Sequence, residues 1–203
     1  EKAAFLSLSD MGKVLPSYEE IPVACAMEGP VLDEYKHIEK ELVEVLRSDK
    51  RTARKILSAY LNLLTVYPDQ PYDQNPIYYP ESNTPIVVPQ DIGDADTFGE
   101  KELRTLEIVR ATIQNGERAL IYTSWIRTDS QQKLKKLLTD EGYRTEILTD
   151  KIKTTDREEW VQKKLAAGMQ VLITNPSLVE TGLDLNAFTT LVFFSMGYSL
   201  FTL

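Results

Sequence analysis

The chain has 203 residues, of which 42% are hydrophobic and 27% charged, and its formal net charge is −8. These values exclude a disordered, collagen-like or low-complexity chain, and no apolar run approaches the roughly 18 residues that a membrane-spanning helix needs. A single cysteine, Cys25, excludes an internal disulfide and argues against a cysteine-based zinc site.

The first third of the chain predicts a short strand and two helices. Residues 21–27 form an apolar run that could be a strand, and Cys25 within it is interpreted as a small core residue. From Leu32 onward, apolar residues recur at spacings of three and four, which predicts a helix. A second helix follows, with apolar residues on one side over 56–64.

Prolines and tyrosines gather in the segment that follows. Six of the ten prolines lie between Pro68 and Pro89, interleaved with four tyrosines. Each proline removes an amide donor and restricts the residue before it, so we predict an irregular linker or wrapping loop over 67–99. Its tyrosines either form a stacking platform for nucleic-acid bases or, in the preferred interpretation, pack against the following domain.

The second half of the chain alternates strands with helices. The predicted strands are 119–123, 144–148, 171–174 and 190–194. The predicted helices end at Asn115-Gly116, at Gly142 and at Gly168. Thr155 and Glu158 fit a capping box that opens the last of these helices. This alternation predicts an α/β fold with a parallel sheet and helices on both faces.

The charge is unevenly distributed. Residues 1–100 carry 9 basic and 18 acidic side chains, a net charge of −9, whereas residues 101–203 carry 14 basic and 13 acidic ones, a net charge of +1. All the net negative charge therefore lies in the first half, which suggests two regions with different roles. The overall charge of the chain does not exclude a nucleic-acid partner for the second half.

Ligands of an open parallel sheet bind beyond the carboxyl ends of its strands. Three predicted loops lie there, over 124–127, 149–151 and 175–184. The last is the longest and contains hydroxyls, an amide, two carboxylates and a glycine. It is suited to placing polar groups against a ligand.

Other kinds of site find little support in the sequence. Segment 93–101 lacks the Gly-Lys-Ser/Thr ending of a phosphate-binding loop, and the absence of GxGxxG argues against a Rossmann-like enzyme. The single histidine, His37, is interpreted as a solvated surface residue rather than part of a nucleophilic triad. Clustered metal ligands are absent from the sequence. Five lysines are predicted to lie on outer helix faces, with phosphate contact as the alternative: Lys133, Lys135, Lys136, Lys163 and Lys164.

Several segments of the second half follow one another in a characteristic order: 119–125, then Gly142-Tyr143, then 155–158, then 171–184. In this order they resemble the second RecA-like lobe of superfamily 2 helicases and translocases, most closely helicase-related proteins allied to the Swi/Snf-type DNA translocases. The beginning of the chain is similar to the start of that lobe at Leu15-Pro16, Met27, Tyr35 and Tyr67-Pro68.

The resemblance implies roles for particular residues. One group matches the segment after the lobe's first strand and the loop that touches phosphates or senses nucleotide: Thr123, Ser124, Trp125, Thr174, Asn175 and Thr181. Gly182 and Asp184 match the Gly-x-Asp element, whose carboxylate can accept a hydrogen bond from the ATP ribose. Alternatively, Trp125 caps the sheet edge, Asp184 is a turn or capping residue, and Glu180 is a solvated loop charge. The stretch from Thr174 to Gly182 is longer than is usual in the family.

The resemblance also implies a domain organisation. Residues 1–66 form a strand and helical extension of the lobe, 67–99 the irregular segment, and 100–203 the incomplete RecA-like C-terminal lobe. Because the Walker A and Walker B segments and an arginine-rich motif are not found in the chain, we expect a fragment of a longer ATPase.

The resemblance further sets expectations for activity and partners. We expect the fragment alone to be inactive, with ATP and Mg²⁺ bound only in the full-length protein. The expected partners are nucleic acid, DNA rather than RNA, and an N-terminal RecA-like lobe, with no membrane. Because no signal peptide opens the chain, a cytoplasmic location is expected. The alternative function is a non-catalytic α/β module that binds a protein through its acidic first half.

Overall fold

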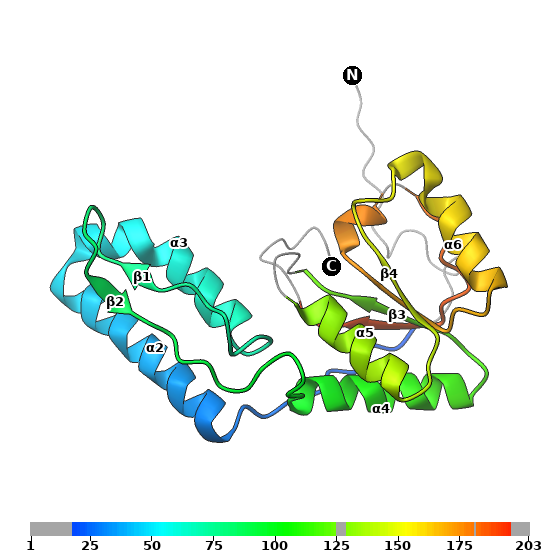
Figure 1. Cartoon of the computed structure of the whole chain (residues 1–203), viewed down its shortest axis with the longest axis horizontal. Coiled ribbons are helices and arrows are strands. Elements are labelled where there is room, and N and C mark those ends of the chain that lie inside the picture. The colour runs from blue at the N-terminus through cyan, green and yellow to red at the C-terminus, as the bar shows by residue number, and fades with distance from the viewer. Residues whose placement is uncertain (1–17, 125–128, 181, 196–203) are drawn as a thin grey trace.

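A computed structural model describes residues 18–124, 129–180 and 182–195 of the chain. An N-terminal arm and a sheet-containing lobe lie side by side (Figure 1). The arm contains α2 (Gly29–Ser48), α3 (Lys50–Val66) and a ribbon of β1 (Ile77–Tyr78) and β2 (Pro85–Val87). The lobe contains α4 (Glu100–Gln114), β3 (Ala119–Tyr122), α5 (Ser130–Asp140), β4 (Thr145–Leu148), η2 (Thr154–Asp156), α6 (Arg157–Ala166), β5 (Val171–Thr174), η3 (Pro176–Leu178) and β6 (Thr190–Phe193).

The two helices of the arm pack on each other and on the ribbon. A single residue, Asp49, separates α2 from α3, and its carboxylate accepts hydrogen bonds from the amides of Arg51 (3.0 Å) and Thr52 (3.1 Å). Such a cap satisfies donors that the first helical turn leaves without partners. The shared core is formed by Ile38, Leu42, Val45, Ala53, Ile56, Tyr60, Leu63, Tyr67, Ile77 and Val87. The Pro/Tyr-rich segment therefore contributes a short ribbon that packs on the arm's own helices.

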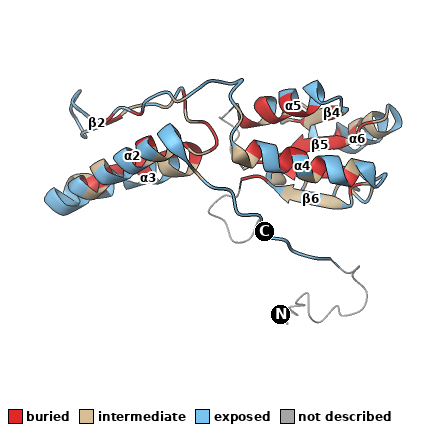
Figure 2. Cartoon of the chain, turned by 90° about the horizontal axis from the view of Figure 1, so that it is seen from below, coloured by how far each residue is buried: buried red, intermediate tan, exposed pale blue. Residues whose placement is uncertain are grey.

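The lobe is built on a four-stranded parallel sheet in the order β4-β5-β3-β6. Alternate residues face opposite sides of a strand. Ile121 and Ile173 pack under α4 and α5, whereas Leu120 and Leu172 pack under α6. Figure 2 shows β5 buried at the centre of the lobe, whereas β6 at the edge of the sheet is only partly buried. The predicted parallel sheet with helices on both faces is confirmed.

Two details of the first half differ from prediction. Residues 21–27 form no strand, and Ile21 and Val23 are exposed. Cys25 is also exposed instead of lying in a core. Among the described strands none pairs with this segment, and the amide of Ala26 donates to the Glu100 carboxylate at 2.6 Å. It is held against the start of α4 as an extended chain.

The predicted capping box before α6 is also wrong. The Thr155 hydroxyl donates to the Asp156 carboxylate at 2.6 Å, and no side-chain cap forms at the start of α6. A turn of 3₁₀ helix over Thr154–Asp156 precedes α6 instead. His37 is exposed as predicted, with Nδ1 3.9 Å from the Glu41 carboxylate.

Buried charges join the arm to the lobe. Lys101 on α4 pairs with Asp69 at 2.5 Å, and the Gln70 side chain accepts a hydrogen bond from the Asp129 amide at 2.9 Å. Lys133, predicted on an outer helix face, is buried and pairs with Glu102 at 2.9 Å. The prediction is wrong for this lysine because the arm covers that part of α5, with the Tyr72 ring 5.9 Å from its ammonium.

Among the described residues, no helix combines the length and apolar character needed to cross a membrane. The same residues contain no group of three or more side chains arranged to hold a metal ion.

Candidate nucleic-acid and nucleotide site

The carboxyl ends of β3, β5 and β6 meet in one polar, hydrogen-bonded edge. The Thr123 amide donates to the Thr174 carbonyl at 3.0 Å, and the Asn175 side-chain amide donates to the Ser124 carbonyl at 3.1 Å. Ser195, just past β6, accepts from the Ser124 amide at its hydroxyl and from the Ser124 hydroxyl at its carbonyl, both at 2.9 Å. The structure thus brings together four of the residues that the resemblance singles out, from two separate segments.

Two of these residues support the edge from within. Thr123 and Thr174 are completely buried. The Thr123 hydroxyl accepts from the Gln131 side-chain amide at 2.8 Å, and the Thr174 hydroxyl donates to the Leu148 carbonyl at 3.3 Å. Their direct contact with nucleic acid stays a prediction. In the structure, both hydroxyls hold neighbouring elements in place.

Asn175 connects the strand edge to the loop that follows. Its carboxamide oxygen accepts from the amide (2.9 Å) and the hydroxyl (2.7 Å) of Ser177, in the turn Pro176–Leu178. Its nitrogen holds the Ser124 carbonyl. Asn175 is buried and Ser177 is exposed, so the buried amide fixes the position of a hydroxyl on the surface.

Replacing Asn175 with alanine is expected to lower the free energy of unfolding by about 1–3 kcal/mol, because buried polar partners lose their hydrogen bonds. The Ser177 amide should also exchange its hydrogen faster. Asn175→Asp is the control for hydrogen exchange: it keeps an acceptor for Ser177, although it also buries a carboxylate against the Ser124 carbonyl and should itself lower stability. Urea unfolding and hydrogen exchange would measure both effects. Unchanged exchange at Ser177 in the alanine variant would contradict this role.

Gly182 and Asp184 lie on the exposed rim of the same loop. Gly182 has a positive φ of 85°, a conformation that favours glycine. One oxygen of the Asp184 carboxylate accepts from the Asn186 amide at 3.1 Å. This bond fits the turn-residue alternative, yet the exposed carboxylate can still accept a hydrogen bond from a hydroxyl of a ligand. Glu180 is exposed, whereas Trp125 and Thr181 lie outside the described residues.

Sequence reasoning missed three residues of this edge: Gln131, Ser177 and Ser195. Ser195 directly follows the last predicted strand, but only the strand order places it beside Ser124. Gln131 lies in the first turn of α5, where its contact depends on how the helix is turned toward β3. The sequence did indicate a contact for Ser177, because the side chain of an Asn in a turn commonly accepts a hydrogen bond from the backbone two residues further on.

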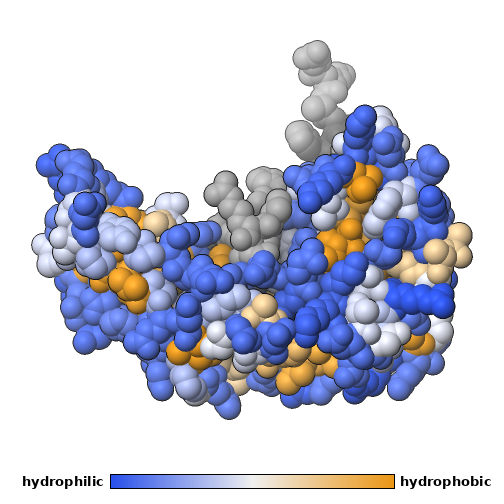
Figure 3. All heavy atoms as spheres, viewed as in Figure 1, coloured by the Kyte–Doolittle hydropathy of each residue, from blue (hydrophilic) through white to orange (hydrophobic). Residues whose placement is uncertain are grey.

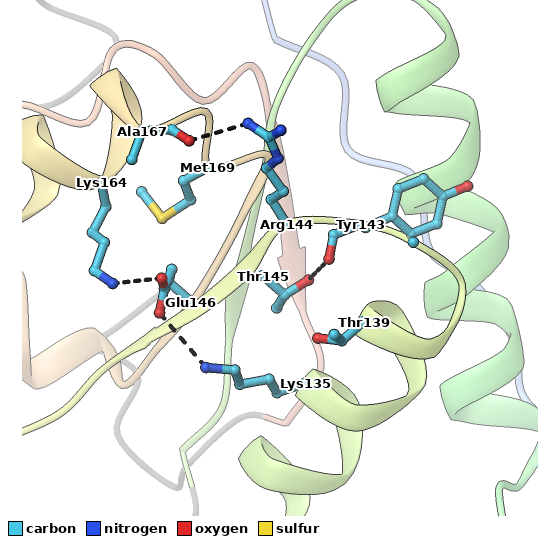
Figure 4. A pocket seen from close by; sticks show the side chains of 10 residues that line it. Lys135, Thr139, Tyr143, Arg144, Thr145, Glu146, Lys164, Ala167 and Met169 are labelled. Carbon is cyan, nitrogen blue, oxygen red and sulfur yellow. Dashed lines mark hydrogen bonds and ion pairs between the residues drawn. The ribbon is translucent and has the colours of Figure 1, made fainter.

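A cavity of about 350 Å³ lies at the other end of the sheet, where β4 begins (Figure 4). Its basic groups are occupied within the protein. Glu146 pairs with Lys164 (2.5 Å) and Lys135 (3.6 Å), and Arg144 donates to the Ala167 carbonyl at 3.1 Å. We assign no function to this cavity.

Comparison with known families supports the interpretation of the lobe. Residues 100–203 match the helicase conserved C-terminal domain. A search of curated proteins found no match to the chain. The family match confirms the predicted C-terminal helicase lobe. It also supports nucleotide binding, interaction with nucleic acid and a companion N-terminal lobe. The chain belongs to the family of the helicase conserved C-terminal domain.

Proposed function

We propose that the chain is the C-terminal lobe of an ATP-dependent helicase or translocase of the Swi/Snf-like group, acting on DNA rather than RNA. One observation carries the proposal. The joined ends of β3, β5 and β6 hold hydroxyl, amide and carboxylate groups at the edge of a parallel sheet, where ligands of such sheets bind.

Within this edge the nucleic-acid backbone contacts the exposed groups. The Ser177 hydroxyl is exposed and Ser124 is half-buried, while Thr123, Thr174 and Asn175 hold them in position. Hydroxyl and amide groups donate to phosphate oxygens without reading bases. Lys151 and Lys153, exposed in the loop after β4, add positive charge at the same end of the sheet.

The residues present fit one side of a nucleotide site. Asp184 is an exposed acceptor for a ribose hydroxyl, and the space around Gly182 is open. Bound ATP with Mg²⁺ supplies the phosphoryl group whose hydrolysis drives movement between two lobes. The part of this chain in that process is to hold the ribose and one wall of the cleft. The groups that stabilise charge on the phosphates come from the companion lobe and an arginine-rich motif.

We therefore expect no ATP turnover by the purified 203-residue chain, because phosphoryl transfer depends on positioned cations and a metal. Release of inorganic phosphate with Mg²⁺-ATP, with and without DNA, would be measured for the chain and for Asp184→Ala. Turnover that is lost in the alanine variant would contradict the proposal. Turnover equal in both proteins would point to a contaminating enzyme.

Nucleic-acid binding tests the edge directly. We expect labelled DNA to bind the chain and to dissociate as salt rises, and Ser177→Glu to weaken binding at least several-fold by placing a charge against phosphate. Gln162→Glu on the exposed side of α6 is the matched control, because it adds the same charge away from the edge. Fluorescence anisotropy with duplex and single-stranded DNA and RNA would measure these affinities.

Equal losses in both glutamate variants would contradict the placement of the site. A chain that binds none of these nucleic acids at low salt would contradict the proposal and favour the protein-interaction module. Tighter binding to RNA than to DNA would overturn the choice of DNA.

A further inference from the structure

The turn between α2 and α3 concentrates positive charge at the end of the arm. Residues 47–55 contain five cations and one acid, Asp49, within a half of the chain that is otherwise strongly acidic. All five cations are exposed, and the four that form no ion pair with a described residue make up what we call the basic tip: Arg47, Lys50, Arg51 and Arg54. Figures 1 and 2 both place this turn at the end of the arm remote from the sheet, and Figure 3 shows a largely hydrophilic surface at that end.

The cations of the basic tip are not neutralised within the described part of the chain. The fifth cation, Lys55, pairs with Glu81 at 3.0 Å. None of the four tip residues forms an ion pair with a described residue, and the Asp49 carboxylate caps two amides of α3. Some exposed cations elsewhere pair with a carboxylate, namely Lys40, Arg104, Arg110 and Lys136, and others, such as Lys151 and Lys153, pair with none that the structure describes. The basic tip differs in that four cations without an ion pair to a described residue lie within residues 47–54.

Two tip residues also oppose the dipole of their own helix. The amino end of a helix carries partial positive charge and favours acidic side chains. The first turn of α3 has none, and Lys50 and Arg51 occupy it instead. Arg47, in the last turn of α2, is favourably placed. Asp49, the N-cap of α3, is the one acid within residues 47–55, and it leaves the four cations of the tip in excess, as happens at surfaces that bind a charged ligand.

We propose that the basic tip binds the phosphodiester backbone of double-stranded nucleic acid, as a second contact remote from the sheet edge. This inference rests on the proposed function, which supplies the polyanion. Three of the four residues are arginines, whose planar guanidinium groups bond two phosphate oxygens at once. No aromatic residue lies between positions 47 and 55, so the tip fits a backbone rather than unstacked bases.

The test compares two variants with the same change in charge. The tip variant is R47Q/K50Q/R51Q/R54Q, and the control is K40Q/R104Q/R110Q/K136Q, which removes four exposed but paired cations. Each phosphate contact contributes about 0.9 to the slope of log affinity against log salt on duplex DNA. We expect the tip variant to bind a short duplex about tenfold more weakly at about 50 mM salt and to lose roughly 2 from that slope.

The control should stay within about twofold of the wild type at the same salt. The tip variant should melt no lower than the wild type, because glutamine is a good helix former and the conflict with the dipole is relieved. If it does unfold, Arg54→Gln alone, in the second turn of α3, should lower the slope by about 0.9.

Each remaining outcome is decisive. Equal losses in both variants, or wild-type affinity in the tip variant, would overturn the basic tip and leave the proposed function standing. A wild-type chain that binds single strands but no duplex would overturn the basic tip alone, and one that binds no nucleic acid would overturn the proposed function as well. If polyglutamate displaces the duplex as well as an unlabelled duplex of equal charge does, the tip is a general surface for anions and the inference fails. Equal loss of single-strand affinity would overturn the preference for a duplex.

Discussion

Replacing Lys133 with methionine is expected to lower the free energy of unfolding by about 3–5 kcal/mol, because it leaves the Glu102 carboxylate buried without its cation. The ammonium of Lys133 lies 2.9 Å from that carboxylate, and the two side chains are 3% and 5% exposed. Burying an unpaired charge is far more costly than losing an exposed ion pair. Urea unfolding of the wild type and the variant would measure the difference.

The matched control is Lys136→Met, three residues further along α5. Lys136 is half-exposed and pairs with Asp96 and Asp140, so its loss should change stability little. Adding Glu102→Gln to Lys133→Met should restore part of the lost stability. The glutamine carbonyl can still accept the Gly99 amide, which Glu102 holds at 3.0 Å. A Lys133→Met protein within about 1 kcal/mol of the wild type would show that the buried pair between α4 and α5 contributes little to stability.

The sheet could be predicted because its signals are local. Parallel strands buried on both faces appear as short continuous apolar runs, and 119–123 and 171–174 are such runs. The ends of helices were indicated by residues typical of helix termini, such as Asn115-Gly116 after α4. The same reasoning failed for 21–27, because an apolar run becomes a strand only where another strand offers it hydrogen bonds. That information lies outside the segment.

Burial of charge could not be predicted for a related reason. Lys133 lies in α5 near Lys135 and Lys136, and although it stands four residues before Leu137 at the border of the apolar side, a lysine there can also extend into solvent. Its burial depends on Glu102 of α4 and Tyr72 of the arm, which meet it only in three dimensions. In the candidate site, likewise, the sequence named Thr123 and Thr174 but could not tell that their hydroxyls face inward. Position along a strand identifies an edge residue, while its role depends on its partners.

The ion pair that joins the arm to the lobe, between the buried Asp69 and the partly exposed Lys101, has a consequence that depends on pH. Asp69 is 2% exposed, and burial raises the pKa of its carboxyl above the ordinary value of 3.8, while Lys101 opposes that rise. A raised pKa in the folded state means that ionisation of Asp69 weakens folding as pH rises through that pKa. Replacing Lys101 with methionine removes the opposing cation, so the pKa of Asp69 should rise further.

Lys101→Met is therefore expected to destabilise the protein near neutral pH, because the buried Asp69 carboxyl loses the cation that stabilises its charge. As pH falls, the deficit relative to the wild type should shrink, since the buried carboxyl takes up a proton and loses its charge. A smaller loss should persist at acidic pH, because the ammonium also lies 4.5 Å from the centre of the Phe194 ring. Urea unfolding of both proteins at neutral and acidic pH would measure the deficit.

Asp69→Asn supplies the control for this pH dependence. In the double variant Asp69→Asn with Lys101→Met, no carboxyl remains to take up the proton, so the deficit should be the same at neutral and acidic pH. A Lys101→Met deficit that is equally large at acidic and neutral pH would contradict the role of Asp69. The junction between arm and lobe would then be held by shape and apolar contact, and its buried charges would not govern how firmly the basic tip is held relative to the sheet edge.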